Sequence, residues 1–201
     1  MKKITTLEFD LQNNASFVAY FSRAYQPWIN NTSLTDSQRE TKVPAILMLN
    51  RWDGRVGFAG GNVDSGENLF KAACRESFEE INHKVIEKEL TPICTHKFEI
   101  GSKTLSTHLF AKEVSNEELF SIQQNIHLSR DYGDEILGSV ICLVGDFSKG
   151  KGFPTFFKTP MATSVKEELI ELIYQEELIP VKELENICLS SGFSLDQLLL
   201  K

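Results

Sequence analysis

The sequence lacks long hydrophobic runs: nowhere in its 201 residues does an apolar stretch reach the roughly 18 residues that a membrane-spanning helix needs. The first residues, MKKITTLEFDLQNN, contain two lysines but no apolar segment behind them. A secretory signal peptide would require such a segment. We therefore expect no membrane partner and a cytoplasmic location, with the nucleus as the alternative.

Cysteine is scarce and widely spaced. The four cysteines lie at least 20 residues apart, at Cys74, Cys94, Cys142 and Cys188. This spacing fits neither a CxxC zinc pattern nor a dense disulfide framework. We expect all four to be reduced and structural.

An excess of positive charge is also absent. Lysine and arginine number 21 against 28 aspartates and glutamates, which gives a formal net charge of −7. Such a balance argues against a surface that coats nucleic acid broadly. It leaves room for a local basic cleft that handles a nucleotide or one RNA end.

What the sequence does contain is enough apolar material for one core. A hydrophobic fraction of 41% over 201 residues predicts a single domain covering residues 1–201. Strands are expected where apolar stretches alternate, at 16–22, 43–50, 93–100, 104–114 and 136–144, with a short strand after the turn at Asp53-Gly54. Helices are expected at 68–82, at 115–125 behind a Ser115-x-x-Glu118 capping box, and at about 162–177. Without regular βαβ alternation, these elements predict an α/β (α+β) sandwich.

The stretch GGNVDSGENLFKAACRESFEEINH, residues 60–83, gathers five carboxylates around three glycines and one arginine. On a helix Glu76, Glu79 and Glu80 project within an arc of about 100°. Converging carboxylates repel one another, and hard divalent cations such as Mg²⁺ or Mn²⁺ are their usual partners. Gly60 and Gly61 let the backbone approach a ligand closely. A plainer interpretation is a solvated, glutamate-rich helix face.

The other face of this helix is expected to pack on the sheet. Phe70, Cys74, Phe78 and Ile81 follow one another at spacings of four, four and three, which is typical of an apolar stripe.

The same stretch resembles the Nudix box, G-x5-E-x7-R-E-U-x-E-E-x-G-U, where U is a bulky aliphatic residue. The matching residues are Gly61, Glu67, Arg75, Glu76, Glu79 and Glu80. Three positions depart from the pattern: Ser77 and His83 replace aliphatic residues, and Asn82 replaces the glycine. Asn82 can adopt the left-handed conformation of a helix C-cap. We expect Ser77 to weaken packing, with Phe78 beside it compensating.

The resemblance implies a Nudix-type α/β/α sandwich with a mixed sheet, and hydrolysis of a nucleoside diphosphate linked to another moiety with Mg²⁺ or Mn²⁺. By position, Glu76, Glu79 and Glu80 correspond to metal ligands, and the Gly60 carbonyl to a further one. One of the catalytic glutamates, Glu79 or Glu80, would deprotonate the attacking water. Glu67 and Arg75 correspond to a supporting pair that orients the helix.

An acid from outside the box often serves as base or ligand in this family. The segment RDYGDEILG supplies Asp131, Asp134 and Glu135. We favour Glu135 as the third catalytic acid. The alternative is a solvated turn acid before a strand.

Similarity to the snoRNA-decapping and inosine diphosphatase branch of Nudix hydrolases extends over roughly residues 15–175. It is carried by AILMLNRWDGRVGFAGGNVD, HLFAKEVSNEEL, GDEILG and FPTFFKTPMATSVKEELIE. In that branch the position of Arg51 would hold phosphate, and that of Phe58 would stack on or wall the base. The purine-reading histidine and glutamine of the branch fall at Val18 and Glu168.

A carboxylate at Glu168 could accept hydrogen bonds from N1 and N2 of guanine, which predicts a shift toward guanine substrates. The alternative places Glu168 on the helix surface, paired to nothing.

Three functions stay open on these residues. The first is a pyrophosphohydrolase acting on a purine nucleoside diphosphate, resembling IDP or GDP, or on the 5′ end of a capped RNA, for which Lys149, Lys151, Lys158 and Lys166 could form a basic path. The second is hydrolysis of a dinucleotide cofactor or nucleoside diphosphate sugar. The third is a Nudix-derived nucleotide or RNA-binding module without turnover, which loss of box acids would favour. A homodimer is compatible with each.

The remaining histidines and aromatics are given no role in chemistry. His83, His96, His108 and His127 share no spacing typical of metal ligands, and His108 is expected to be a hydrogen-bonded core residue. The segment Phe153 to Phe157 is expected in the core or an interface.

Overall fold

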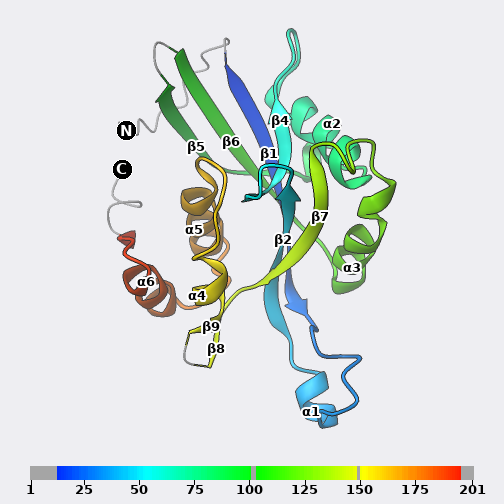
Figure 1. Ribbon diagram of the computed structural model, residues 1–201, viewed down its shortest axis with the longest axis vertical. Helices are drawn as coiled ribbons and strands as arrows, with labels where there is room; N and C mark the ends of the chain where they lie inside the picture. Colours follow the sequence, from blue (N-terminus) through cyan, green and yellow to red (C-terminus); the bar gives the residue numbers. More distant parts are fainter. Residues whose placement is uncertain (1–12, 101–102, 149, 196–201) are drawn as a thin grey trace.

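A mixed sheet of seven strands forms the centre of the computed structural model, which describes residues 13–100, 103–148 and 150–195 (Figure 1). One path through the sheet runs in the order β3-β2-β1-β6-β5, while β4 pairs with β1 and β7 pairs with β2. The strands are β1 (Asn14–Tyr25), β2 (Val43–Arg51), β3 (Val56–Gly57), β4 (Ala59–Asn62), β5 (Thr91–Ile100), β6 (Lys103–Glu113) and β7 (Ile136–Leu143). The expected strands are therefore all present.

Strand β1 is shared between three neighbours. Along one edge it pairs with β6 in parallel, from Asn14 opposite Ser106 onward. Along the other edge its first half pairs antiparallel with β4, and its second half pairs antiparallel with β2 from Phe21 opposite Ile46. The sheet therefore divides where β1 changes partner from β4 to β2. Strand β4 is followed, after a short loop, by the next helix of the chain.

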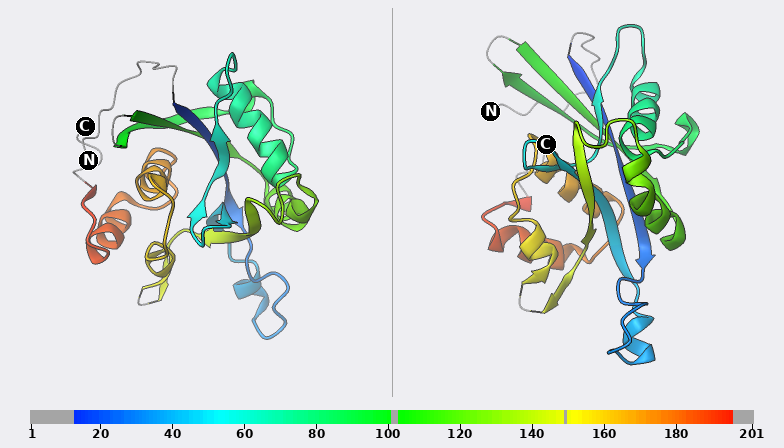
Figure 2. Two further views of the ribbon diagram at one scale, coloured as in Figure 1. Left: turned by 45° about the horizontal axis from the view of Figure 1, so that its top comes forward. Right: turned by 45° about the vertical axis from the view of Figure 1, so that its right-hand side comes forward.

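Helices cover both faces of the sheet (Figures 1 and 2). Helices α2 (Leu69–Ile81) and α3 (Asn116–Asn125) lie on one face, while α4 (Phe153–Phe156), α5 (Val165–Gln175) and α6 (Val181–Ser190) lie on the other. This arrangement confirms the predicted α/β/α sandwich. Short elements complete it: α1 (Asp36–Arg39), the 3-10 turns η1 (Glu87–Glu89) and η2 (Ile126–Leu128), and a hairpin of β8 (Asp146–Ser148) with β9 (Lys151–Gly152).

Two apolar cores, one on each face, follow from the alternation of side chains along the strands. Val18 and Tyr20 of β1 belong to the core beneath α2 and α3. Ala19 and Phe21, the intervening residues, belong to the core beneath α5 and α6. Both faces of β1 are therefore buried.

Most helix boundaries agree with the sequence. The Ser115 hydroxyl accepts a hydrogen bond from the backbone N–H of Glu118 and caps α3 as expected. The segment 26–42 is a loop except for the single turn α1, which a capping box at Thr35 and Gln38 opens. The predicted connection through Gly101-Ser102 lies outside the described residues.

The predicted apolar stripe of α2 is wrong in one respect. Phe78 is 46% exposed, whereas the buried residues of the helix are Ala72, Ala73, Ser77, Glu80 and Ile81. Small side chains on this face let the helix approach the strands closely, which turns the large Phe78 outward. Phe78 therefore does not compensate for Ser77.

Ser77 has a partner of its own. The Tyr20 hydroxyl donates a buried hydrogen bond to the Ser77 hydroxyl over 2.9 Å. Burial raises the pKa of the Tyr20 hydroxyl, so this group stays a neutral donor. A polar pair thus replaces the aliphatic contact, and the packing loss expected from Ser77 is offset by a hydrogen bond.

Other expectations for individual residues are confirmed. His108 is buried, with its ring nitrogens bonded to the Thr95 hydroxyl and the Asn14 amide oxygen, and burial lowers its pKa to about 4. Phe153 and Phe157 lie in the core. None of the four cysteines, all within the described ranges, forms a disulfide bond.

Within the part of the chain that the structure describes, no helix has the length and apolar character to cross a membrane.

Candidate active site

Helix α2 carries the three box glutamates, Glu76, Glu79 and Glu80, and both of its ends are capped. The Asn68 side chain accepts a hydrogen bond from the backbone N–H of Lys71 over 2.8 Å. At the other end Asn82 adopts φ 52° and ψ 32°, the left-handed conformation expected of the residue that replaces the box glycine. The helix therefore begins after Asn68 and ends at Ile81, directly after Glu80.

The two glycines of β4 bring the backbone against α2. The N–H of Gly60 donates to Oε2 of Glu80 over 2.7 Å. Gly60 has φ +151°, and a Cβ there would lie 2.6 Å from Cα of Phe17. A Cβ on Gly61 would lie 2.8 Å from Oε1 of Glu76. Only glycine fits at Gly60, and at Gly61 a larger residue would displace the Glu76 carboxylate.

Arg75 joins the acids of the box. Its Nη1 lies 2.7 Å from Oε1 of Glu76 and 2.9 Å from Oε2 of Glu79. Its Nη2 lies 3.0 Å from Oε2 of Glu67 and donates to the Asn62 carbonyl. The predicted Glu67–Arg75 pair is therefore present, and it ties the helix to the loop that precedes it.

A second arginine, which the sequence analysis did not single out, also reaches the box. Arg130 pairs with Glu79 and, over 2.6 Å, with Oδ1 of Asp131. The backbone N–H of Asp131 donates to the Glu79 carbonyl over 3.1 Å. Its signal in the sequence is its position directly before Asp131.

In spite of these arginines, two of the box glutamates lie where their ionisation is unfavourable. Burial raises the pKa of Glu80 to about 8, although the hydrogen bond from Gly60 lowers it; the charges of Glu76 and Glu135 raise this pKa and that of Arg51 lowers it. Burial likewise raises the pKa of Glu76. These oxygens are hard ligands held where their negative charge is costly, and a Mg²⁺ or Mn²⁺ ion would lower that cost. The residues present therefore fit the metals that the sequence predicted.

The predicted third acid, Glu135, lies close enough to the box for its charge to affect the box glutamates. Its charge raises the pKa values of both Glu76 and Glu80, whereas the Asp131 carboxylate is bound to Arg130. The backbone N–H of Trp52 donates to the Glu135 carbonyl over 3.0 Å, which anchors the loop to the β2–β3 turn. The exposed Glu135 side chain is therefore held near the box.

Arg51, at the end of β2, also lies near the box, since its charge lowers the pKa of Glu80. Its Nε is buried and donates to no acceptor among the described residues, although Oδ2 of Asp53 lies 3.6 Å away. A Cβ on Gly57 would come within 3.2 Å of the Arg51 side chain, so this glycine makes room for it. The guanidinium is thus close to the glutamates and able to donate to a phosphate.

The other predicted substrate residues lie deeper. Phe58 is 2% exposed and packs in the core beneath α5, so it could wall a pocket but has no free face; its stacking on a base stays a prediction. Val18 is buried in the opposite core.

Glu168 is not the unpaired surface residue that one interpretation allowed. It is 1% exposed, and its Oε1 accepts hydrogen bonds from the hydroxyls of Thr107 and Ser164, each over 2.7 Å. Burial raises its pKa to about 7. The residue is a buried acid held by two neutral donors, and its role in reading a base stays a prediction.

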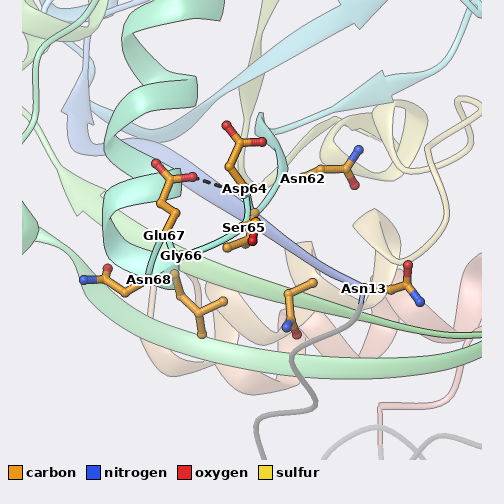
Figure 3. A pocket seen from close by; sticks show the side chains of 10 residues that line it. Asn13, Asn62, Asp64, Ser65, Gly66, Glu67 and Asn68 are labelled. Carbon is orange, nitrogen blue, oxygen red and sulfur yellow. Dashed lines mark hydrogen bonds between the residues drawn. The ribbon is translucent and has the colours of Figure 1, made fainter.

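A pocket of about 900 Å³ opens beside the box, between the start of β1 and the loop that leads from β4 into α2 (Figure 3). Its lining is rich in side-chain amides, from Asn13, Asn14, Asn62 and Asn68, and includes the acids Asp64 and Glu67. Arg51, Phe58 and Glu168 do not line it. This pocket is therefore distinct from the position that those three residues predicted for a nucleotide.

Comparison with known proteins agrees with this geometry. The Nudt16-like family model, described as U8 snoRNA-decapping enzyme-like, matches residues 24–179. The U8 snoRNA-decapping enzyme of Homalodisca vitripennis is 44% identical over 122 residues, which are 58% of this chain and 63% of that protein. This chain thus spans less than two thirds of that relative's length. The enzyme of the same name from Mus musculus is 27% identical over 138 residues, 67% of this chain and 71% of that protein.

Relatives of another name match over a similar stretch. The Tudor-interacting repair regulator protein of Homo sapiens is 28% identical over 149 residues, which are 70% of this chain and 66% of that protein. Among solved structures, a MutT/nudix family protein from Enterococcus faecalis has a TM-score of 0.55 at 12% identity, covering 96% of this chain and 73% of the other. At that identity the likeness shows the fold alone.

Proposed function

Because the chain belongs to the Nudt16-like family of U8 snoRNA-decapping enzyme-like proteins within the Nudix fold, we propose that it is a metal-dependent pyrophosphohydrolase. Its substrate would be a 5′-capped RNA or a purine nucleoside diphosphate resembling IDP or GDP. The observation that carries this proposal is the buried Glu80, bonded to the Gly60 N–H and flanked by Glu76, Glu135 and Arg51. A merely solvated glutamate face would not bury an acid of raised pKa beside an arginine.

Each residue has a proposed task in the reaction. Glu76, Glu79, Glu80 and the Gly60 carbonyl would hold Mg²⁺ or Mn²⁺, which would neutralise the diphosphate and acidify a bound water. Arg51 donates hydrogen bonds to a phosphate oxygen and so fixes the scissile bond beside α2.

Glu135 is exposed at the end of a tethered loop and takes the proton from the attacking water. Glu79 and Glu80 are the alternative bases. Arg75 and Glu67 keep the box glutamates in position.

The proposed base preference rests on Glu168. Both of its observed hydrogen bonds go to Oε1. A carboxylate with its second oxygen turned to a base would pair with N1 and N2 of guanine, whereas hypoxanthine offers a hydrogen only at N1. We expect Glu168→Ala to lose any preference for GDP or a methylguanine cap over IDP. Equal activity of wild type and variant on guanine and inosine compounds would remove this part of the proposal.

A second function, binding without turnover, is favoured by the Tudor-interacting repair regulator relatives. The feature that argues against it is that Glu67, Glu76, Glu79 and Glu80 are all retained around Arg75. Hydrolysis of a dinucleotide cofactor or a nucleoside diphosphate sugar is a third possibility, since the selectivity of such enzymes lies outside the box.

One experiment separates these functions. Purified protein is incubated with Mg²⁺ or Mn²⁺ and a panel of IDP, GDP, capped RNA, NADH and ADP-ribose, and products are identified by mass spectrometry. We expect metal-dependent cleavage of GDP, IDP or the cap. Glu80→Gln is the inactive control, and Glu117→Gln, an exposed glutamate of α3, is the matched control that should retain activity.

Turnover of NADH or ADP-ribose alone would favour the third function. Binding of a nucleotide without turnover would favour the second.

The place and assembly of the protein are also proposals. We propose that it acts in the cytoplasm, with the nucleus as the alternative, and that it can form a homodimer. Fractionation of cells with an antibody and light scattering of the purified chain would test these two statements. Of the lysines suggested as an RNA path, Lys149 lies outside the described residues; Lys151, Lys158 and Lys166 would be tested together by alanine substitution and the salt dependence of RNA binding.

A further inference from the structure

A cluster of three potential metal ligands lies on the side of the sheet opposite to the box helix. Cys94 and His96 belong to β5, and Glu171 belongs to α5. The Cys94 sulfur, a His96 ring nitrogen and a Glu171 carboxylate oxygen all lie within 4.8 Å of one another. Among the described residues no other three such ligand atoms lie this close together, those of the box glutamates included. No motif in the sequence indicated it, because 75 residues separate His96 from Glu171.

The backbone explains why the three side chains meet. Residues two apart on a strand point to the same face, so Cys94 and His96 both face α5. The helix is held there by a hydrogen bond from the Gln175 side chain to the Ile93 carbonyl, over 2.9 Å. Nε2 of His96 lies 3.3 Å from Oε1 of Glu171. The cluster therefore spans a contact between two secondary-structure elements that are fixed by other interactions.

The chemistry of the three groups suits a transition metal. Thiolate, imidazole and carboxylate together are the ligands of Zn²⁺ sites, with bond lengths of about 2.0–2.3 Å. In a tetrahedral site such bonds place ligand atoms about 3.3–3.7 Å apart, so the observed atoms need to converge only slightly. A thiolate and a carboxylate also neutralise a divalent ion, which suits a site where His96 is only 1% exposed.

The burial of the three side chains and the type of their ligand atoms also favour a transition metal. His96 is buried, while Cys94 and Glu171 are only partly buried. The partly open side gives an ion a route to the three ligand atoms. Hard ions such as Mg²⁺ prefer oxygen-only sites, so this set discriminates against the ions proposed for the box.

We propose that Cys94, His96 and Glu171 form a binding site for a divalent transition metal ion of the Zn²⁺ class, which joins β5 to α5. The site is independent of the proposed hydrolysis, because it shares no residue with the box. A neutral or charged hydrogen bond between His96 and Glu171 alone is the competing explanation for their proximity, and the two explanations differ in the part that Cys94 plays.

Cobalt titration tests this proposal. Co²⁺ is added to the full chain in the presence of excess Mg²⁺, which occupies the oxygen-only box, and absorption is recorded. A thiolate bound to Co²⁺ gives a charge-transfer band in the near ultraviolet, whereas carboxylates do not. We expect the wild-type protein to develop this band and Cys94→Ser to lose it. Cys74→Ser removes another partly buried thiol and should keep the band.

The variant Glu171→Gln tests how much the Glu171 carboxylate contributes to Co²⁺ affinity, and Glu167→Gln on the same helix is the matched control. We expect Co²⁺ affinity to fall at least about tenfold in the first and to stay unchanged in the second, since even outer-shell partners of a metal commonly contribute that much. Zn²⁺ should also raise the unfolding temperature of wild type but not of Cys94→Ser. Circular dichroism confirms that each variant is folded.

Two results would overturn the proposal: the absence of a thiolate band in folded wild-type protein, or its persistence in Cys94→Ser. An unaltered band in Glu171→Gln with full affinity would remove Glu171 from the site and with it the three-ligand proposal.

Discussion

Two glutamates of this protein are almost completely buried, one on each side of the sheet, and their surroundings differ. Glu80 on α2 accepts a hydrogen bond from a backbone amide and is surrounded by further carboxylates and an arginine. Glu168 on α5 accepts hydrogen bonds from two hydroxyls, those of Thr107 and Ser164. Burial raises both pKa values, to about 8 and about 7. Similar burial thus accompanies two different local chemistries.

The difference shows what a raised pKa means in each place. Around Glu80 further acids concentrate negative charge, and a divalent cation would remove the penalty on ionisation. Around Glu168 two hydroxyls donate hydrogen bonds, and the charges of Glu167 and Glu171 add to the increase in its pKa, so protonation of Glu168 removes its penalty. We therefore expect Glu80 to respond to metal and Glu168 to respond to pH.

The largest expected effect is on catalysis. Glu80→Gln keeps the size of the side chain but removes its charge, and should lower kcat about 10³-fold, the scale on which a group that handles the proton or its metal contributes. Glu168→Gln should change kcat by much less and act mainly on base preference. Steady-state kinetics on the preferred substrate checks both. Equal losses in the two variants would contradict the division of roles.

The next effect concerns stability as a function of pH. In the folded protein the Glu168 pKa is about 7, above the value of about 4.5 of an unperturbed glutamate. Below pH 4.5 both states are protonated and this residue carries no penalty. Between pH 4.5 and 7 the unfolded chain loses the proton first, so the free energy of unfolding falls as pH rises. The total decrease is on the order of 3 kcal/mol, since one pKa unit corresponds to about 1.4 kcal/mol.

Glu168→Gln should remove this dependence while keeping an acceptor for the two hydroxyls. Urea unfolding at several pH values, with saturating Mg²⁺ to hold the box constant, measures it. A wild-type profile with the same slope as the variant would show that Glu168 does not titrate in this range.

A somewhat smaller effect is expected from metal binding. An ion that binds only the folded state stabilises it by about 2.7 kcal/mol at a concentration 100 times its Kd. Mn²⁺ should therefore raise the unfolding temperature of wild type and of Glu168→Gln, but not of Glu80→Gln. Differential scanning calorimetry with and without Mn²⁺ checks this. A shift that survives in Glu80→Gln would place the ion elsewhere.

The smallest effect is expected from substitutions in the buried pair of Tyr20 and Ser77 beneath α2. Tyr20→Phe and Ser77→Ala each leave one hydroxyl without its partner, and each should cost about 1–2 kcal/mol of unfolding free energy. The double variant should cost less than the sum, because no orphaned hydroxyl remains. Urea unfolding of the four proteins gives the coupling. Additive losses would mean that the hydrogen bond between Tyr20 and Ser77 contributes nothing.

Features that depend on near neighbours in the chain were predictable from the sequence. The spacing of Glu76, Glu79 and Glu80 predicted that they lie on one face of a helix. The tolerance of asparagine for the left-handed conformation predicted that Asn82 is the C-cap of this helix. The pairing of Glu67 with Arg75 followed from the motif. Each of these relations is set within about one or two helical turns.

Features that depend on distant segments were not predictable. Arg130 meets Glu79 across 51 residues, and Thr107 meets Glu168 across 61. Helical periodicity defined the faces of α2 but could not show that alanines and Ser77 would be closest to the sheet, with Phe78 outside. In the folded chain Ser77 is bonded to Tyr20 of β1, 57 positions away in the sequence. Pairs of this kind leave no periodic signal in either segment.

The parallel pairing of β1 with β6 has a consequence for how the protein is made. Asn14 and Ser106 are neighbours in the sheet although the ribosome adds them 92 residues apart. The glutamate helix α2 therefore emerges from the ribosome before β6 does, at a stage when β1 is able to pair only with β4 and β2. Chain fragments that end before β6 should consequently be protease-sensitive throughout, even though they contain every residue of the box.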